Sequence, residues 1–289
     1  MLQSSLDVIQ CVKCHSKLDL TVFHQDKEIE EGVLTCTKCG LVYPVMQGVS
    51  ILIDDFALYL SNRQKLGGEL LLSAKTAQMK LIIKTTLGKS TKNQDFSIIE
   101  KKWVQVYQKN QDSKFYGIIK KSLKSDSDLS LEHGCSIGII SKHLAKKSKK
   151  AFGIDKSFYA IVQAKKQPQK NLDFFVADSL EHPFGDTKFD VIVGLNLFEL
   201  IEPKLLLKLF SEQTQKNGTL VLSDPYDYER DIKSIKEPLY SDDVRKELVS
   251  LGFIVSKKTK KPSNIPWNLN LHERATLQYL VDLIVAKKS

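Results

Sequence analysis

The chain has 289 residues, of which 42% are hydrophobic, a length and composition typical of a globular protein with about two domains. No apolar run approaches the ~20 residues of a membrane-spanning helix and no secretory signal is evident, so we expect a cytoplasmic protein with no membrane partner. The 43 lysines and arginines exceed the 34 aspartates and glutamates, giving a net charge of +9. This balance favours anionic partners such as RNA or an acidic protein, although a generally lysine-rich surface would produce it too.

The positive charge is carried almost entirely by lysine. Arginine is scarce, and the arginines are Arg63, Arg230, Arg245 and Arg274. Specific recognition of a base or phosphate usually uses the two-pronged guanidinium group. Any contact with nucleic acid is therefore expected to be mostly electrostatic and directed at the backbone.

Two cysteine pairs near the N-terminus, separated by 21 residues, predict a metal site. Each C-x-x-C turn can place two thiolates on one ion, and two such turns complete a tetrahedral zinc site with the ligands Cys11, Cys14, Cys36 and Cys39. Two disulfides or a redox-active pair are the alternatives; a cytosolic chain disfavours the former, and the latter would not need a second pair. Because cysteines fill all four places, no position remains for a catalytic water, and the zinc is expected to be structural.

Two neighbours of these cysteines complete the prediction. His15 is adjacent to a ligand and is interpreted as a bystander, whereas Gly40 suits a turn that requires positive φ. The residues from Cys39 to Ile53 read CGLVYPVMQGVSILI. Residues 8–54 as a whole resemble the small zinc-binding activator proteins of tRNA, rRNA and release-factor methyltransferases, although Ser50 stands where that family often has proline. The resemblance implies a module, residues 1–55, that docks on a methyltransferase.

Residues 56–125 are predicted to form a helical, lysine-rich connecting segment. Apolar residues recur at three- and four-residue spacing in 66–88 and again in 98–110, the period of a helix with one buried face. We expect Trp103, Tyr107 and Phe115 to pack a helix against the domain that follows.

From about residue 126 the chain alternates between apolar runs and amphipathic segments. The expected strands are 128–132, 150–154, 172–177, 189–194, 218–223, 252–257 and 277–286. The expected helices are 137–147, 157–167, 201–215 and 240–250. Such alternation predicts an α/β domain with a mostly parallel sheet, covered by helices on both faces, that binds ligands beyond the carboxyl ends of its strands.

Landmarks of a nucleotide-type cofactor site fall at those strand ends. Glu132 precedes a tight turn from Gly134 to Gly138, and Asp155 and Asp178 end the next two expected strands. Pro183-Phe184 and Phe189-Asp190 follow in order. This ordered set resembles class I S-adenosylmethionine-dependent methyltransferases over residues 126–289. The resemblance implies a Rossmann-like seven-stranded sheet whose last strand is reversed.

The same resemblance implies the cofactor contacts. The methionine part of S-adenosylmethionine would be cradled by Glu132, Gly134, Ser136 and Gly138. Asp155 would hold the ribose, while Asp178 and Ser179 would contact adenine. Ser136 departs from the family, which usually has glycine there, and we expect weaker or altered binding. A nicotinamide enzyme would require G-x-G-x-x-G, and Ser136 in the position of its second glycine argues against that class.

Candidate catalytic residues follow the fourth and fifth expected strands of the domain. Asn196 and Glu199 are the polar residues of the segment that normally forms one wall of the pocket, and Tyr226 follows Asp224-Pro225. Methyl transfer depends mainly on positioning the nucleophile in line with the methyl group, although a nitrogen nucleophile can need a base. The Asn/Asp-Pro-Pro-Tyr signature of enzymes that methylate amino groups of nucleic-acid bases and glutamine side chains is missing here.

One further segment, residues 265–274, and two histidines lie near these motifs. Residues 265–274 are expected to form a loop, either anchored by Trp267 or, by a faint resemblance to the methyltransferase domain of ovothiol-forming enzymes, part of a small-molecule site. His133 and His182 are expected to be exposed loop residues.

The sequence therefore predicts an S-adenosylmethionine-dependent methyltransferase with a fused structural zinc module, acting on RNA or a translation-related protein. One alternative is a methyltransferase for small imidazole- or amine-type molecules. A second is a non-catalytic RNA- or protein-binding protein with a degenerate cofactor site. The oligomeric state does not follow from the sequence.

Overall fold

The computed structural model of the chain describes residues 1–89, 91, 95–123, 126–230 and 235–289. These residues form two compact units. Unit 1 comprises Met1–Gln105 and Ile154–Gly185, and unit 2 comprises Val106–Gly153 and Asp186–Ser289. Residue 125, where the connecting segment is expected to end, lies outside the described residues.

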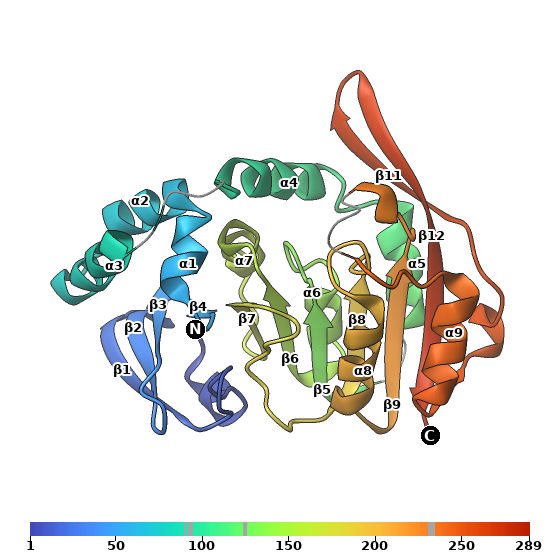
Figure 1. Cartoon of the computed structure of the whole chain (residues 1–289), viewed down its shortest axis with the longest axis horizontal. Coiled ribbons are helices and arrows are strands. Elements are labelled where there is room, and N and C mark those ends of the chain that lie inside the picture. The colour runs from blue at the N-terminus through green and yellow to red at the C-terminus, as the bar shows by residue number, and fades with distance from the viewer. Residues whose placement is uncertain (90, 92–94, 124–125, 231–234) are drawn as a thin grey trace. The chain divides into compact units, whose positions relative to one another are not determined.

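Unit 1 is built on a sheet with the strand order β1-β2-β3-β4-β7 (Figure 1). Its elements are η1 (Gln3–Asp7), β1 (Leu18–Gln25), β2 (Ile29–Cys36), β3 (Val42–Met46), β4 (Val49–Leu52), α1 (Phe56–Ser61), α2 (Gln64–Ser73), α3 (Ala77–Lys89), α7 (Phe158–Lys165) and β7 (Leu172–Ala177). Two further elements, α4 (Ser97–Lys109) and β6 (Ser148–Asp155), begin in one unit and end in the other.

The zinc-module strands β1 to β4 form an antiparallel meander that continues into the α/β part of the chain. Gln47 and Gly48 link β3 to β4 with φ angles of 52° and 75°, the left-handed pair that a tight hairpin turn requires. Strand β4 then pairs in parallel with β7, with Ile51 opposite Val176. All six residues of β7 are buried, as expected for a strand covered on both faces. The zinc module is thus joined to a cofactor-domain strand by backbone hydrogen bonds.

Helices α1 to α4 confirm the helical prediction for the described part of residues 56–123. Asp55 begins α1 by accepting a hydrogen bond from the backbone N–H of Leu58 at 2.8 Å, the usual role of an N-cap carboxylate. The helical period buries Leu66 and Leu70 of α2, and Met79 and Ile83 of α3. None of the described helices combines the length and apolar character required to cross a lipid bilayer.

Unit 2 contains the strand order β5-β8-β9-β12-β10 (Figure 1). Its elements are α5 (Lys114–Ser122), β5 (Ser127–His133), α6 (Ser141–Ala145), β8 (Phe189–Leu195), α8 (Pro203–Gln213), β9 (Thr214–Asp224), η2 (Tyr228–Arg230), α9 (Ser241–Ser250), β10 (Phe253–Val255), η3 (Lys257–Thr259), β11 (Ile265–His272) and β12 (Ala275–Lys288). Strands β5, β8 and β9 are parallel, and β12 runs antiparallel to β9. The expected reversed last strand is therefore confirmed.

The segment 265–274 is not the loop that the sequence predicted. Residues Ile265–His272 form β11, which pairs with β12 in an antiparallel hairpin. Trp267 lies on the buried face of this hairpin. Its ring is stacked on that of Tyr107, with ring centres 6.2 Å apart, and its ring centre lies 5.1 Å from that of Phe115. The expected packing role of Tyr107 and Phe115 is confirmed, and their partner is the hairpin.

Candidate metal centre and cofactor site

The four predicted zinc ligands converge in unit 1. Their sulfur atoms all lie within 4.8 Å of one another, with Cys11 Sγ 3.6 Å from Cys39 Sγ and Cys14 Sγ 3.4 Å from Cys36 Sγ. Disulfides require about 2.05 Å, so these pairs are thiols. Tetrahedral zinc with bonds of about 2.3 Å separates its sulfur ligands by about 3.8 Å, close to these spacings. The cluster can hold zinc with four cysteine ligands.

Local hydrogen bonds favour the thiolate form of two of the four cysteines, Cys14 and Cys36. The backbone N–H groups of Lys38 and Cys39 both lie 3.4 Å from Cys36 Sγ. Desolvation opposes ionisation of Cys36, but these hydrogen bonds prevail and lower the pKa of its thiol. Hydrogen bonds from Ser16 lower the pKa of Cys14 to about 6. Gly40 has φ of 71°, as the turn requires, and His15 is not part of the ligand cluster.

The first cysteine turn supports the loop that follows β7. The backbone N–H of Gln10, next to Cys11, donates to the carbonyl of Pro183 at 2.6 Å. His182 and Phe184 of this loop are buried, so the prediction of an exposed His182 is wrong. Burial lowers the pKa of His182 to about 4, and the neutral ring accepts a hydrogen bond from the N–H of Phe184 at 3.2 Å. The loop after Asp178 is therefore a packed part of the zinc module's surroundings.

Unit 1 also positions the predicted ribose and adenine acids. Asp155 ends β6 and accepts a hydrogen bond from the N–H of Ser157 at 2.8 Å. Asp178 follows β7 directly, and Ser179 beside it is buried. Lys156 Nζ lies 2.5 Å from Asp178 Oδ2, an ion pair that the sequence interpretation missed. The only signal for this ion pair in the sequence was the position of Lys156, directly after the strand-end acid Asp155.

Helices of the connecting segment hold the backbone beside Asp155. The hydroxyl of Tyr59 in α1 donates to the carbonyl of Lys156 at 2.8 Å. Arg63 forms an ion pair with Glu100 of α4 at 2.7 Å. The Glu100 carboxylate also accepts a hydrogen bond from the hydroxyl of Ser157 at 3.1 Å. The carboxylate and guanidinium are largely buried, and desolvation raises the pKa of Glu100. The segment thus fixes the turn between β6 and α7.

The glycine-type turn after β5 belongs to unit 2 and has an alternating left-handed backbone. Gly134, Ser136 and Gly138 have φ angles of 62°, 47° and 74°. A Cβ atom on Gly134 would lie 2.4 Å from Leu197 Cδ2, so a larger residue would force Leu197 to shift and would also be strained by the positive φ. Ser136 therefore adopts the conformation of the glycine that it replaces, at a steric cost that glycine avoids.

Buried polar groups at the end of β5 fix this turn. Glu132 is buried, and its Oε2 accepts a hydrogen bond from the N–H of Ser141, at the start of α6, at 2.6 Å. His133 is fully buried as well, with Nε2 at 2.8 Å from Gln213 Oε1, so its predicted exposure is wrong. Cys135, within the turn, is a buried free thiol.

The candidate catalytic residues Asn196, Glu199 and Tyr226 lie around the carboxyl ends of β8 and β9. Asn196 has φ of 56°, and its Oδ1 accepts from the hydroxyl of Ser223 at 3.0 Å. Asp224, not proposed from the sequence, accepts hydrogen bonds from the N–H groups of Phe198 at 3.0 Å and Tyr226 at 2.7 Å. Burial, with the charge of Glu199 adding to it and these N–H groups opposing it, raises the pKa of Asp224 to about 7.

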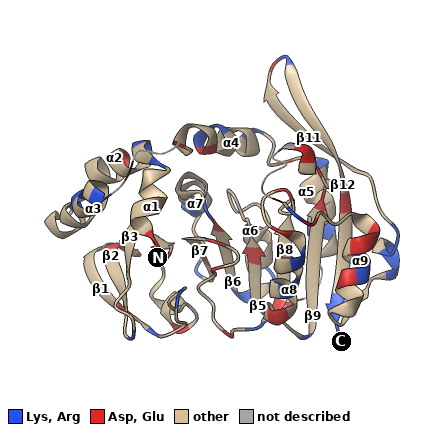
Figure 2. Ribbon diagram, in the orientation of Figure 1, with Lys and Arg blue, Asp and Glu red and all other residues tan. Residues whose placement is uncertain are grey.

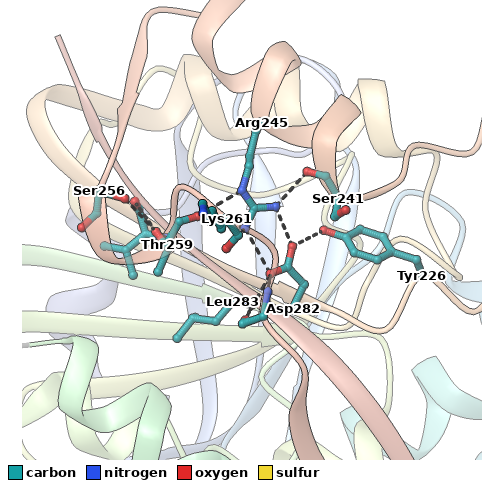
Figure 3. A network of polar contacts seen from close by, with 10 residues as sticks. Tyr226, Ser241, Arg245, Ser256, Thr259, Lys261, Asp282 and Leu283 are labelled. Atoms are coloured by element: carbon teal, nitrogen blue, oxygen red, sulfur yellow. Dashed lines mark hydrogen bonds and ion pairs between the residues drawn. The ribbon is translucent and has the colours of Figure 1, made fainter.

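Tyr226 is held in place by its hydroxyl. That group donates to Asp282 Oδ2 at 3.0 Å, and Asp282 forms a buried ion pair with Arg245 at 2.7 Å (Figure 3). Burial and the neighbouring Asp282 raise the pKa of Tyr226 far above its usual value. The phenol therefore stays protonated and is not available as a general base, and its ring is stacked with Phe198 with ring centres 6.4 Å apart.

The predicted cofactor residues are divided between the units. Asp155, Asp178 and Ser179 lie in unit 1, whereas Glu132, Gly134, Ser136 and Gly138 lie in unit 2 with the candidate catalytic residues. Parallel strands that end in acids, a left-handed turn after the first of them and a reversed last strand define the class I methyltransferase type of α/β protein.

Comparisons with known families agree with this class. Residues 131–222 match the family described as Methyltransferase domain, and residues 5–48 match the Trm112p-like protein family. The chain carries a class I S-adenosylmethionine-dependent methyltransferase domain, preceded by a Trm112-like domain with its four-cysteine cluster. The predicted enzyme class and both parts of the predicted resemblance are thereby confirmed.

Comparison with solved structures finds matches at low sequence identity. A complex between the Haloferax volcanii Trm112 methyltransferase activator and a methyltransferase matches at 15% identity and a TM-score of 0.51, covering 65% of this chain and 96% of that chain. A TehB-like methyltransferase from Corynebacterium glutamicum matches at 16% identity and a TM-score of 0.49, covering 66% and 99%. NodS, an N-methyltransferase from Bradyrhizobium japonicum, matches at 16% identity and a TM-score of 0.45, covering 61% of this chain and 98% of that chain. No curated protein sequence matches the chain.

Proposed function

We propose that this methyltransferase modifies RNA or a translation-related protein, with its zinc module acting in cis as the activator of the catalytic domain. The observation that carries the proposal is the parallel pairing of β4 with β7, directly before Asp178. A second contact, from Gln10 to Pro183, supports the loop that follows the same acid. The zinc module thus borders the residues that we assign to adenine.

The charge distribution supports an anionic substrate. Residues 56–125 contain 14 lysines and arginines but only four aspartates and glutamates, a net charge of +10 that exceeds the +9 of the whole chain. The similar structure of an activator bound to a methyltransferase supports an activating role for the zinc module. RNA fits the positive charge, because its backbone is a dense polyanion.

The assigned roles follow the geometry of each unit. We propose that Glu132, Gly134, Ser136 and Gly138 cradle the methionine part of the cofactor. Asp155 would bind the ribose hydroxyls, and Asp178 with Ser179 would bind adenine, sharing the Asp178 carboxylate with Lys156. Bound S-adenosylmethionine would supply the electrophilic methyl group, while Asn196 and Glu199 would orient the acceptor against the Tyr226 ring.

The wider organisation is part of the proposal. We assign residues 1–55 to the zinc domain, 56–125 to the connecting segment and 126–289 to the catalytic domain. A cytoplasmic location is supported by the four free thiols of the cluster, since a reducing compartment keeps such cysteines available for metal. Support for the small-molecule alternative is reduced, because residues 265–272 form a strand. A non-catalytic protein with a degenerate site is the remaining alternative, tested below.

Calorimetric titration of the zinc-loaded chain with S-adenosylhomocysteine tests the cofactor site, and we expect one bound molecule per chain. Incubation of cell extract with the protein and a radiolabelled methyl donor then identifies the substrate by the fraction that takes up label. Label in RNA or protein is expected. The matched control is Gly134→Val, whose side chain would collide with Leu197. Absence of cofactor binding by the wild type would refute catalysis, and label only in small molecules would refute the substrate class.

A further inference from the structure

Four lysines are concentrated in the five residues Lys257–Lys261, which we call the lysine loop. Lys257, Lys258, Lys260 and Lys261 are all exposed. The loop lies beside α9 and carries one of the dense groups of basic residues in unit 2 (Figure 2). Acidic residues are present on α9, namely Asp242, Asp243 and Glu247, yet within the described part of the chain no ion pair joins them to the loop lysines. The four ammonium groups are therefore available to an external anion.

The buried Arg245 holds the backbone of the lysine loop from the interior of the protein. This arginine is only 7% exposed, and it donates to the carbonyls of Thr259 at 2.9 Å and Lys261 at 3.2 Å (Figure 3). Its remaining contacts are the Ser241 carbonyl and both carboxylate oxygens of Asp282. The guanidinium charge is neutralised inside the protein, so its role is to fix the loop while the lysines face outward.

Two hydroxyl side chains add further anchors to β12. The Thr259 hydroxyl accepts a hydrogen bond from the N–H of Val285 at 3.0 Å. Ser263, just after the loop, donates its N–H to Asp282 at 2.8 Å and accepts from the N–H of Leu283 at 2.9 Å. A loop fixed in this way loses little backbone entropy when it binds a ligand, which raises the affinity that each interaction provides.

The same network reaches the candidate catalytic residues. Asp282, which fixes Arg245 and thereby the loop, also accepts the hydroxyl of Tyr226 at 3.0 Å. The loop and Tyr226 are therefore held by a single carboxylate within unit 2. A substrate bound to the loop would lie on the same rigid support as the residues that we assign to the methyl acceptor.

We propose that the lysine loop binds the phosphodiester backbone of an RNA substrate and directs it toward Tyr226, an inference that rests on the proposed function. Lysine is a compact, strongly hydrated point charge, suited to phosphates without sequence selection. The loop therefore sets the position of the backbone, and base selection is left to other parts of the protein.

The test uses the full zinc-loaded chain carrying Lys257→Gln, Lys258→Gln, Lys260→Gln and Lys261→Gln together. Binding of a labelled single-stranded RNA of about 20 nucleotides, longer than the ~4–16 that one module covers, is measured by fluorescence anisotropy at several salt concentrations. We expect affinity to fall at least about tenfold near 0.1 M salt, and the salt slope to decrease by ~0.7 for each phosphate that is no longer neutralised. The matched control replaces four exposed lysines of unit 2 that lie outside both the lysine loop and residues 56–125, namely Lys146, Lys188, Lys216 and Lys236, with glutamine.

The control variant should retain most of the RNA affinity, and both variants should bind S-adenosylhomocysteine like the wild type. Equal losses of RNA affinity in the two variants would overturn the proposal, because general charge would then explain binding. Loop-dependent binding of a polyglutamate peptide as tight as that of RNA would overturn it in favour of an acidic protein. The cofactor titration is independent of these readouts, so a failed methyltransferase assignment is recognised separately.

Discussion

Ser136 is the residue at which the cofactor turn departs most clearly from its family. A serine in the left-handed region, with φ of 47°, costs about 1 kcal/mol relative to glycine. Ser136→Gly should therefore raise the melting temperature by about 2 °C, because ~1 kcal/mol corresponds to a few degrees in a protein of this size. Differential scanning fluorimetry checks the stability and calorimetry the affinity for S-adenosylhomocysteine, which we expect to be equal or tighter.

Ser136→Ala is the control, because alanine keeps the Cβ atom that causes the strain and should give no stabilisation. A lower melting temperature for Ser136→Gly than for the wild type would contradict the interpretation of strain. Stabilisation without tighter cofactor binding would mean that the serine is tolerated by the site.

Individual residues were predictable where their chemistry requires a fixed spacing. The four cysteines fall in this class, because one metal ion needs all of them at one place. The burial of His133 and His182 was mispredicted. The hydrogen-bond partner of His133 is remote in the sequence, and that of His182 is a backbone N–H whose position depends on the geometry of the loop. Gln213, which contacts His133, lies 80 residues away in the chain. No local pattern indicates such a contact.

At the scale of elements, Asp224 ties the loop after β8 to the loop after β9. Its raised pKa of about 7, against ~3.9 unfolded, means that the native state retains a proton that the unfolded chain releases. This contribution to stability is complete below about pH 4 and is lost as the pH rises through about 7. Asp224→Asn removes it, so the stability advantage of the wild type over the variant should shrink by about 3 kcal/mol between about pH 5 and pH 8.

Urea unfolding of both proteins at the two pH values measures this difference. An advantage that stays constant with pH would show that Asp224 does not titrate in this range. Glu199→Gln offers a matched test, because removing its charge should lower the pKa of Asp224 and move the loss of stability to lower pH.

The succession of strands and helices in the catalytic domain was readable from apolar runs and their separations. Strand β11 was missed, although Trp267, Leu269 and Leu271 alternate with polar residues, because Pro266 and two asparagines suggest a loop. Its buried face depends on Tyr107 and Phe115, which are supplied by a helical region more than a hundred residues earlier. The pairing of β4 with β7 was likewise unpredictable, since a short apolar strand does not specify its neighbour.

For the molecule as a whole, the zinc cluster is expected to control cofactor binding through unit 1. The path runs from the first cysteine turn through Gln10 to the loop after Asp178, and from β2 and β3 through β4 to β7. A buried ion pair of Lys165 with Asp173 on β7 at 2.6 Å, shared with Glu28 of the zinc module at 2.9 Å, adds to this connection. Loss of zinc should therefore disorder the support of Asp178.

The variant Cys36→Ser with Cys39→Ser removes half of the ligands, and structural zinc sites typically contribute folding energy directly. We expect less than one zinc per chain by metal analysis, a lower melting temperature and at least about tenfold weaker binding of S-adenosylhomocysteine. His15→Gly is the matched control, because it alters the other cysteine turn of the same cluster at a non-ligand whose φ of 53° suits glycine, and it should retain both zinc and cofactor affinity. A zinc-free double variant that binds the cofactor as tightly as the wild type would show that the module stabilises itself alone, and that the β4–β7 pairing transmits nothing to the adenine site.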